Sequence, residues 1–190
     1  LPKINKTIFI FGICLSLFME NNHDDDVLVI SPSDHYIKDA SKFNNIIHNA
    51  TEIAKDTQNI VTLGIKPIKP SSQFGYIEFE SATGSKKFYN VKRFHEKPNE
   101  EKAKEYLNLG NFFWNSGVFI GTVKTFKKNY LSFASDIYEC CLSSMNEIKK
   151  DGIFIRPKSD VFSNVRSISI DYAVIEKMKN IKVLPLDTAW

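Results

Sequence analysis

The chain has 190 residues, of which 43% are hydrophobic and 25% are charged. This composition is typical of a folded globular protein, so we expect one domain or part of one. The 25 lysines and arginines and 22 aspartates and glutamates give a net charge of +3, and they are scattered along the chain. Without a basic block or interleaved aromatic residues, the sequence predicts no nucleic-acid partner.

The three cysteines are Cys14 and the adjacent Cys140 and Cys141. An odd number of cysteines without ligand-like spacing argues against a disulfide framework and against a zinc site. We therefore expect reduced thiols in a cytoplasmic protein.

Residues 8–19 form an apolar run that follows Lys3 and Lys6, as in a secretory signal. A helix that crosses a bilayer needs about 20 residues. No small-residue cleavage site follows Met19, because the chain continues into polar and acidic residues. The run therefore predicts a buried core helix and no membrane segment.

Residues 27–30 are four consecutive apolar residues, which predict a strand buried on both faces. A Ser-Pro-Ser turn follows and presents Asp34 and His35. Ligands of open parallel sheets bind beyond the carboxyl ends of the strands, where a carboxylate can reach a phosphate-bound Mg²⁺. Asp34 is therefore a candidate metal ligand, and the alternative is that it orders the turn or caps the next helix.

Apolar residues between Phe43 and Ala54 recur at helical spacing, with polar residues on the other face. Residues 59–65 then form a second apolar run of strand length. A strand, a helix and a strand predict a right-handed crossover with a parallel strand pair. The predicted fold class is therefore α/β.

Residues 75–80 and 86–96 predict an antiparallel pair that projects from this sheet. Gly75 either allows the backbone to approach a ligand or simply serves a turn. Glu96 and Lys97 end the pair, either as a solvated ion pair or as groups that bind a sugar phosphate. In that second interpretation the carboxylate accepts from hydroxyls and the ammonium binds phosphate.

Asn99 predicts the start of a helix that runs to Leu107. Residues 111–121 then predict a strand, although Asn115-Ser116-Gly117 interrupts its apolar pattern. A buried asparagine without hydrogen bonds costs about 1–3 kcal/mol. We therefore expect Asn115 to bond to the backbone or to a ligand hydroxyl.

Two helices are predicted between residues 123 and 150, followed by an irregular segment over 151–167. A further helix begins at Ser169 or Asp171, either of which is a suitable cap. Residues 181–186 predict the last strand.

Five motifs carry a resemblance to a known family. In chain order they are Pro-Ser-Asp-His from Pro32, Leu-Gly-Ile-Lys-Pro from Leu63 with Gly-Tyr-Ile from Gly75, Phe-His-Glu-Lys-Pro from Phe94, Phe-Trp-Asn-Ser-Gly-Val-Phe from Phe113, and Ser-Ile-Asp-Tyr-Ala-Val-Ile-Glu-Lys from Ser169. Over residues 20–190 they resemble the bacterial mannose-1-phosphate guanylyltransferases. The resemblance implies a Rossmann-like nucleotidyltransferase core, with a mixed sheet flanked by helices. It also implies that GTP and mannose 1-phosphate give GDP-mannose and pyrophosphate, with Mg²⁺.

The resemblance also implies roles for single residues. Asp34 matches the metal aspartate, Gly75 the backbone against the sugar, Glu96 the acceptor for sugar hydroxyls, Lys97 the cation near the sugar phosphate, and Asn115 and Asp171 the polar groups near the sugar. The sugar phosphate attacks the α-phosphorus in line, so the protein positions the reactants and offsets charge. No residue is implied as a covalent catalyst.

The chain also departs from the family pattern. Residues 1–26 lack the expected glycine-rich phosphate loop, and the chain ends at Trp190 before the expected motif with a second metal aspartate. We therefore expect a divergent start over 1–26 and the central and C-terminal part of a nucleotidyltransferase domain over 27–190, truncated at both ends. Losing one charge-stabilising group typically costs about 10²–10³ in rate, so we expect the isolated chain to be weak or inactive.

Two alternatives stay open. One is a pyrophosphorylase that uses another hexose 1-phosphate with UTP or dTTP. The other is a non-catalytic remnant or partner-binding subunit, because the apolar run at 8–19 would be an exposed patch if unburied. A homo-oligomer or a complementing chain is compatible with each.

Overall fold

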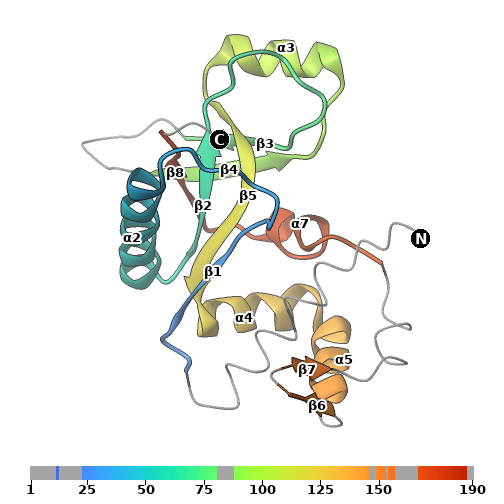
Figure 1. The fold of residues 1–190 in the computed structure, drawn as a ribbon. Coiled ribbons are helices and arrows are strands. Elements are labelled where there is room, and N and C mark those ends of the chain that lie inside the picture. Colours follow the sequence, from blue (N-terminus) through green and yellow to red (C-terminus); the bar gives the residue numbers. More distant parts are fainter. Residues whose placement is uncertain are drawn as a thin grey trace. The chain divides into compact units, whose positions relative to one another are not determined.

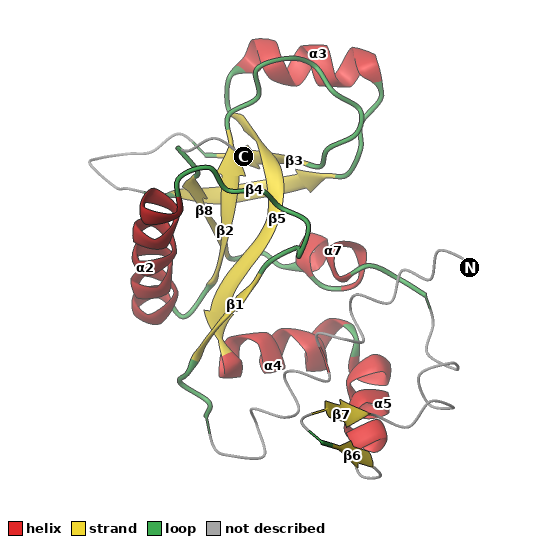
Figure 2. Cartoon of the chain, in the orientation of Figure 1, coloured by secondary structure: helices red, strands yellow, loops and turns green. Residues whose placement is uncertain are grey.

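The computed structural model describes Gly12 and residues 23–80, 88–145, 149–152, 154–156 and 167–187. The chain forms two compact units (Figures 1 and 2). One combines Leu1–Asp26 with Val123–Met178, and the other combines Val27–Thr122 with Lys179–Trp190. The helix predicted for residues 8–19 lies outside the described residues, except for Gly12, which is helical and buried.

The second unit is built on a six-stranded sheet with the strand order β1-β5-β2-β8-β4-β3. The strands are β1 (Val27–Ile30), β2 (Ile60–Ile65), β3 (Tyr76–Phe79), β4 (Tyr89–His95), β5 (Phe112–Thr122) and β8 (Ile181–Pro185). β2 and β8 pair in parallel, while the other strand pairs are antiparallel. This mixed sheet with flanking helices confirms the predicted fold class.

The long strand β5 pairs with three other strands. Trp114 pairs with both β2 and β3, and Ile120 pairs with both β2 and β1. A strand has only two edges, so β1 and β3 must share the edge of β5 that faces away from β2. β3 pairs along Phe112–Trp114 and β1 along Phe119–Thr122. We call the stretch between them, residues 115–118 on this shared edge, the β5 break.

The pairing corrects three of the predictions. β1 and β2 run in the same direction but do not pair, because β5 lies between them. β1 ends the strand order, so it is an edge strand and is half-buried, with Val29 45% exposed, rather than buried on both faces. β3 and β4 do pair, but they do not project, since β3 also pairs with β5 and β4 with β8.

Two helices with well-defined ends cover the sheet. In α2 (Ala40–Thr57) the Asp39 side chain accepts from the Lys42 amide at 2.9 Å, and in α3 (Glu100–Leu109) Asn99 accepts from the Lys102 amide at 2.9 Å. Each cap satisfies a backbone donor that would otherwise lack a partner. Gly110, with φ of 74°, ends α3 in the left-handed conformation that glycine adopts at low cost. Both predicted helices are confirmed.

Helix α3 and the side chain of Asn115 lie on opposite faces of the sheet. Trp114 packs with Ala103 and Tyr106 of α3, in a cluster that also contains Tyr76. Successive side chains of a strand point to opposite faces. Asn115 therefore points to the face away from α3, as does Phe113, which packs with Ile77 and Val183.

The first unit contains α4 (Val123–Phe133), α5 (Ser135–Met145), β6 (Lys149–Asp151), β7 (Phe154–Arg156), α7 (Ile170–Ala173) and the 3₁₀ turn η1 (Ile175–Lys177). The two predicted helices are confirmed. Tyr130 and Ile137 are buried in them, whereas Leu131 and Leu142 are 47% and 36% exposed. The segment predicted to be irregular includes β7, which pairs with β6 in a short hairpin. Over the described ranges, no helix is both long and apolar enough to cross a membrane.

Cys140 and Cys141 of α5 are thiols that are not joined in a disulfide. Burial, with a smaller contribution from Cys140, raises the pKa of Cys141 to about 12. Cys141 is therefore protonated at neutral pH and is a packing residue rather than a nucleophile.

We expect the substitution Gly64→Ala to destabilise the second unit. A β-carbon at Gly64 would lie 2.7 Å from Cγ2 of Val183 and 2.8 Å from Cβ of Phe113, so the sheet would have to shift. Overpacking of this kind costs about 1–3 kcal/mol in the free energy of unfolding, measurable by urea denaturation. Gly110→Asn is the control, since a β-carbon there meets nothing within 4 Å and asparagine tolerates the left-handed φ of 74°. Equal stability of the two variants would contradict this account of Gly64.

Candidate functional site

Three of the predicted site residues meet at the β5 break. The backbone N–H of Asn115 donates to the Gly75 carbonyl at 2.8 Å. Tyr76 pairs with His95, so Glu96, the next residue, lies opposite Gly75. A β-carbon added to Gly75 would be 2.6 Å from Oε2 of Glu96 and 3.6 Å from Cβ of Asn115. The fold therefore brings Gly75, Glu96 and Asn115 together from separate parts of the chain.

The absence of a side chain at Gly75 determines where the Glu96 carboxylate lies. At 2.6 Å, any β-carbon at position 75 would displace Oε2 of Glu96. Glycine thus leaves a carboxylate, an amide and bare backbone next to one another. This arrangement matches the ligand-approach interpretation of Gly75 better than a simple turn.

Lys97 follows Glu96 in an unusual backbone conformation. Its Nζ lies 2.9 Å from Oε1 of Glu96, and the side chains are 63% and 17% exposed, respectively. Lys97 has φ of 43°, in the left-handed region that is costly for residues other than glycine. Pro98 restricts it further, because a residue before proline favours extended conformations. Strain of this kind is common at ligand-binding sites.

Asn115 is hydrogen-bonded within the protein, as its position required. Its Oδ1 accepts from the Gly117 amide at 3.0 Å and lies 3.4 Å from the hydroxyl of Thr62. The partners are backbone and a neighbouring side chain. The amide group is therefore held in one orientation before any ligand binds.

The turn that carries Asp34 runs alongside the β5 break. A β-carbon at Gly117, which has φ of 74°, would lie 3.2 Å from Cγ of Pro32. Pro32 and Gly117 are thus in close contact, and Asp34 follows two residues later with an exposed side chain. The structure brings the predicted metal aspartate to the same region as the predicted sugar-binding residues.

The residues present suit Mg²⁺ carried by a nucleotide better than a metal site made by protein alone. Among the described residues, no group of three or more histidine, cysteine or acidic side chains could hold a metal ion. Mg²⁺ commonly binds one or two carboxylates together with substrate phosphates and water. A single exposed carboxylate at Asp34 fits that mode.

Asp171 belongs to the other compact unit and lies in the first turn of α7, half-buried. The Ser169 side chain accepts from the Tyr172 amide at 3.4 Å, so Ser169 is the helix cap. The capping alternative for Asp171 is therefore wrong, and its role near a sugar stays a prediction.

Thr62 is a site neighbour that the sequence pattern did not reveal. It is fully buried in β2, within an apolar run that gave no signal of a polar role. Only the pairing of β2 with β5, and the register shift after Thr62, brings its hydroxyl to Asn115.

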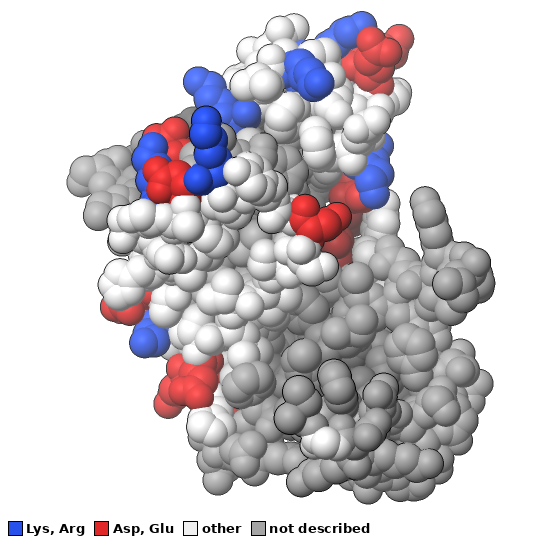
Figure 3. All heavy atoms as spheres, in the orientation of Figure 1, with Lys and Arg blue, Asp and Glu red and all other residues white. Residues whose placement is uncertain are grey.

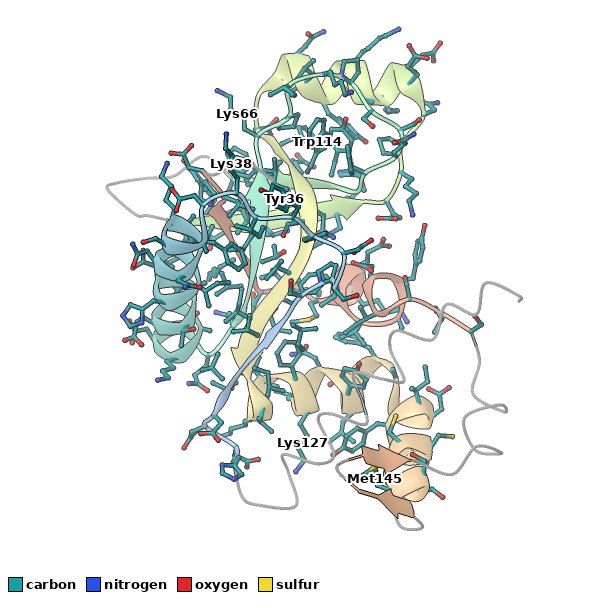
Figure 4. The ribbon with its side chains drawn as sticks, in the orientation of Figure 1. Tyr36, Lys38, Lys66, Trp114, Lys127 and Met145 are labelled. Carbon is teal, nitrogen blue, oxygen red and sulfur yellow. The ribbon has the colours of Figure 1, made fainter. Side chains whose placement is uncertain are left out.

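A tyrosine and two lysines lie on the loops that follow β1 and β2. Figure 4 labels Tyr36, Lys38 and Lys66, whose side chains are exposed on the loops after β1 and β2. Figure 3 shows acidic and basic side chains mixed over the described part of the face drawn, without an extended patch of one sign. This mixture suits a small charged ligand better than a polyanion.

A polar network on the other face of β4 supports the strand end that carries Glu96. His95 lies 3.4 Å from Oε2 of Glu78 through Nε2 and 3.1 Å from the Tyr106 hydroxyl through Nδ1. Nζ of Lys92 lies 2.6 Å from Oε1 of Glu78. The hydrogen bond from Lys92 lowers the pKa of Glu78, with further lowering from His95, against a smaller opposing effect of burial. The last residue of β4 is thus tied to both β3 and α3.

Comparison with known proteins gives consistent matches. The family model described as nucleotidyl transferase matches residues 12–181. The xanthan biosynthesis protein XanB of Xanthomonas campestris is 37% identical over all of this chain and 39% of that protein. A mannose-1-phosphate guanylyltransferase of Escherichia coli is 32% identical over 94% of this chain and 40% of that protein. The chain therefore spans about two fifths of these relatives.

Among solved structures, a mannose-6-phosphate isomerase from Helicobacter pylori has a TM-score of 0.84 and 28% identity. That match covers all of this chain and 71% of the neighbour. The arrangement of strands and helices is thus shared with an experimentally determined protein.

We expect Glu78→Gln to remove a pH-dependent part of the stability. The pKa of Glu78 is lowered from 4.5 in the folded protein, so its ion pair stabilises the fold above 4.5 and is lost as the pH falls through the lowered value. The difference in unfolding free energy between wild type and variant should be at most about 1 kcal/mol near pH 7, because Lys92 is largely exposed, and should shrink on acidification.

Urea denaturation at several pH values measures this difference. Lys92→Met is the matched variant, because it keeps Glu78 but removes the largest cause of its lowered pKa. A difference between wild type and Glu78→Gln that stays constant from neutral to acidic pH would contradict the assignment.

Proposed function

Because the chain belongs to the nucleotidyl transferase family, we propose that it forms the sugar-phosphate-binding part of a mannose-1-phosphate guanylyltransferase. In the complete protein this enzyme would convert GTP and mannose 1-phosphate into GDP-mannose and pyrophosphate. Curated relatives that carry this name at 32% and 34% identity support the proposal. The solved neighbour from Helicobacter pylori is also named for a mannose phosphate, which supports the sugar more than the nucleotide.

The observation that carries the proposal is the meeting of Gly75, Glu96 and Asn115 at the β5 break. A sugar offers hydroxyls that donate and accept hydrogen bonds. The Glu96 carboxylate accepts, the side-chain amide of Asn115 bonds directionally, and the absence of a side chain at Gly75 leaves room for that carboxylate. Lys97 adds a cation beside this group, as a phosphate ester requires.

The proposed reaction needs no covalent bond to the protein. A phosphate oxygen of mannose 1-phosphate attacks the α-phosphorus of GTP, the bond from that phosphorus to the β-phosphate oxygen breaks, and pyrophosphate leaves. Glu96 and Asn115 orient the sugar, and Lys97 offsets the charge of its phosphate, so the attacking oxygen is held in place. Asp34 would hold Mg²⁺, which when bound neutralises charge on the nucleotide phosphates.

The finer parts of the proposal rest on shared motifs and on the names of the relatives. Asp171 is proposed near the sugar only from the motif that it shares with the family. GTP is favoured over UTP and dTTP by the names of the curated relatives. Weak turnover by this chain alone, and a homo-oligomer or a complementing chain, stay predictions.

Titration calorimetry with mannose 1-phosphate tests the sugar site directly. We expect the folded chain to bind mannose 1-phosphate and Glu96→Gln to bind about ten- to a hundredfold more weakly, because a hydrogen bond to a charged group contributes about 1.5–3 kcal/mol. Glu101→Gln is the matched control, since Glu101 is exposed on α3. No binding by folded wild type would contradict the proposal.

Pyrophosphate release with GTP, UTP or dTTP and Mg²⁺ then tests the reaction on the same samples. Release that favours UTP or dTTP would replace the guanylyl assignment. Robust release that Asp34→Asn abolishes and the exposed control Asp56→Asn leaves intact would support Asp34 as metal ligand. The same result would contradict the expectation of weak turnover.

We expect Lys97→Gly to separate stability from ligand binding. Glycine adopts the φ of 43° without strain, so the free energy of unfolding should rise by up to about 1 kcal/mol after the flexibility of glycine is subtracted. Affinity for mannose 1-phosphate should nevertheless fall, as it should in Lys97→Met, which keeps the strain and removes the charge. A Lys97→Gly variant that is less stable than Lys97→Met would contradict the strain argument.

A further inference from the structure

We propose that Thr62 is a positioning residue that holds Asn115 in the orientation in which it donates a hydrogen bond to the ligand. This inference deepens the proposed function and rests on it for the identity of the ligand. Thr62 is fully buried, and its hydroxyl lies 3.0 Å from the Val118 carbonyl and 3.4 Å from Oδ1 of Asn115. Thr62 touches no part of the ligand and acts through Asn115.

The hydrogen bonds fix which end of the Asn115 amide faces which way. The Gly117 amide can only donate, and the atom 3.0 Å from it is Oδ1. If the amide were turned over, its NH₂ group would face the Gly117 N–H, donor against donor. The Thr62 hydroxyl has a single proton, which it shares between the Val118 carbonyl at 3.0 Å and this oxygen at 3.4 Å, so it adds a weaker preference for the same orientation.

The register shift in the β2–β5 pairing makes this contact possible. Thr62 pairs with Phe119 and Gly64 pairs with Asn115, so the shift falls between Thr62 and Gly64. This irregularity lets one hydroxyl reach both the Val118 carbonyl and the side chain of Asn115. Gly117, in turn, keeps its amide toward Oδ1 in a left-handed conformation with φ of 74°.

The orientation has a consequence for selectivity. Oδ1 of Asn115 already accepts within the protein, so Asn115 meets a ligand through its NH₂ group, which has two hydrogens to donate, whereas the Glu96 carboxylate can only accept. A donor and an acceptor that lie on either side of Gly75 match a pair of ligand hydroxyls, one accepting and one donating. A ligand lacking one of these hydroxyls would leave a protein group unpaired and should bind more weakly.

Thr62→Val and Thr62→Ser test the inference. Valine keeps the shape and removes the hydroxyl, while serine keeps the hydroxyl. Relaxation of the ¹⁵N-labelled Asn115 side-chain amide, recorded without ligand, should show equal rigidity in wild type and Thr62→Ser and a more mobile amide in Thr62→Val, which keeps only the bond from the Gly117 N–H. An equally rigid Asn115 amide in Thr62→Val would overturn the proposal, whatever the chain binds.

Binding of mannose 1-phosphate and its monodeoxy analogues gives the second measurement. Thr62→Val should lower affinity for mannose 1-phosphate about three- to tenfold and reduce its preference over one deoxy analogue. In an Asn115→Ala background the same substitution should have no further effect on affinity. An undiminished effect there would show that Thr62 does not act through Asn115 and would overturn the proposal.

The two measurements separate this inference from the proposed function. A mobile Asn115 amide in Thr62→Val, together with no binding of mannose 1-phosphate by wild type, would support the positioning of Asn115 and contradict the sugar-phosphate assignment.

Discussion

The second unit depends on a single constraint, which is that β5 must pair with three strands although it has two edges. β2 takes one edge, and β3 and β1 divide the other. The stretch between them lies outside both pairings and is held by the segments next to those strands. The Asn115 backbone N–H donates to the Gly75 carbonyl just before β3, and Pro32, just after β1, contacts Gly117. The predicted ligand-binding residues lie where regular sheet hydrogen bonding stops.

The two faces of the sheet differ, because one is packed against helices and the other carries the predicted ligand-binding residues. The face toward α2 and α3 is filled by apolar clusters and by the His95–Glu78 network. The opposite face presents Asn115, and Glu96 reaches the same place from the end of β4. Packing on the first face therefore holds the strands that carry Asn115 and Glu96 in place. Precise placement of a few polar atoms is the requirement of a reaction that depends on position and charge.

Local signals in the sequence predicted much of this fold, and long-range pairing accounts for the errors. Asn99 caps its helix as the sequence indicated, because a cap depends on neighbouring residues, whereas α2 is capped by Asp39 and not by Asp34. The exposure of β1 depends on its place at the end of the strand order, which no local pattern encodes. Motif order brought Gly75, Glu96 and Asn115 into one hypothesis. Thr62 was missed because a threonine within an apolar strand looks like a packing residue until its partner across the sheet is known.

The division of β5 between β1 and β3 also bears on how the protein folds. Thr62 and Asn115 are separated by 53 residues along the chain, and their contact requires the β2–β5 pairing. The β3–β4 hairpin closes a much shorter loop and can form early, but alone it lacks Asn115. The binding site therefore comes into existence only when β2 has paired with β5. A partly folded chain would carry helices and a hairpin but no site, so ligand can stabilise only the completed sheet.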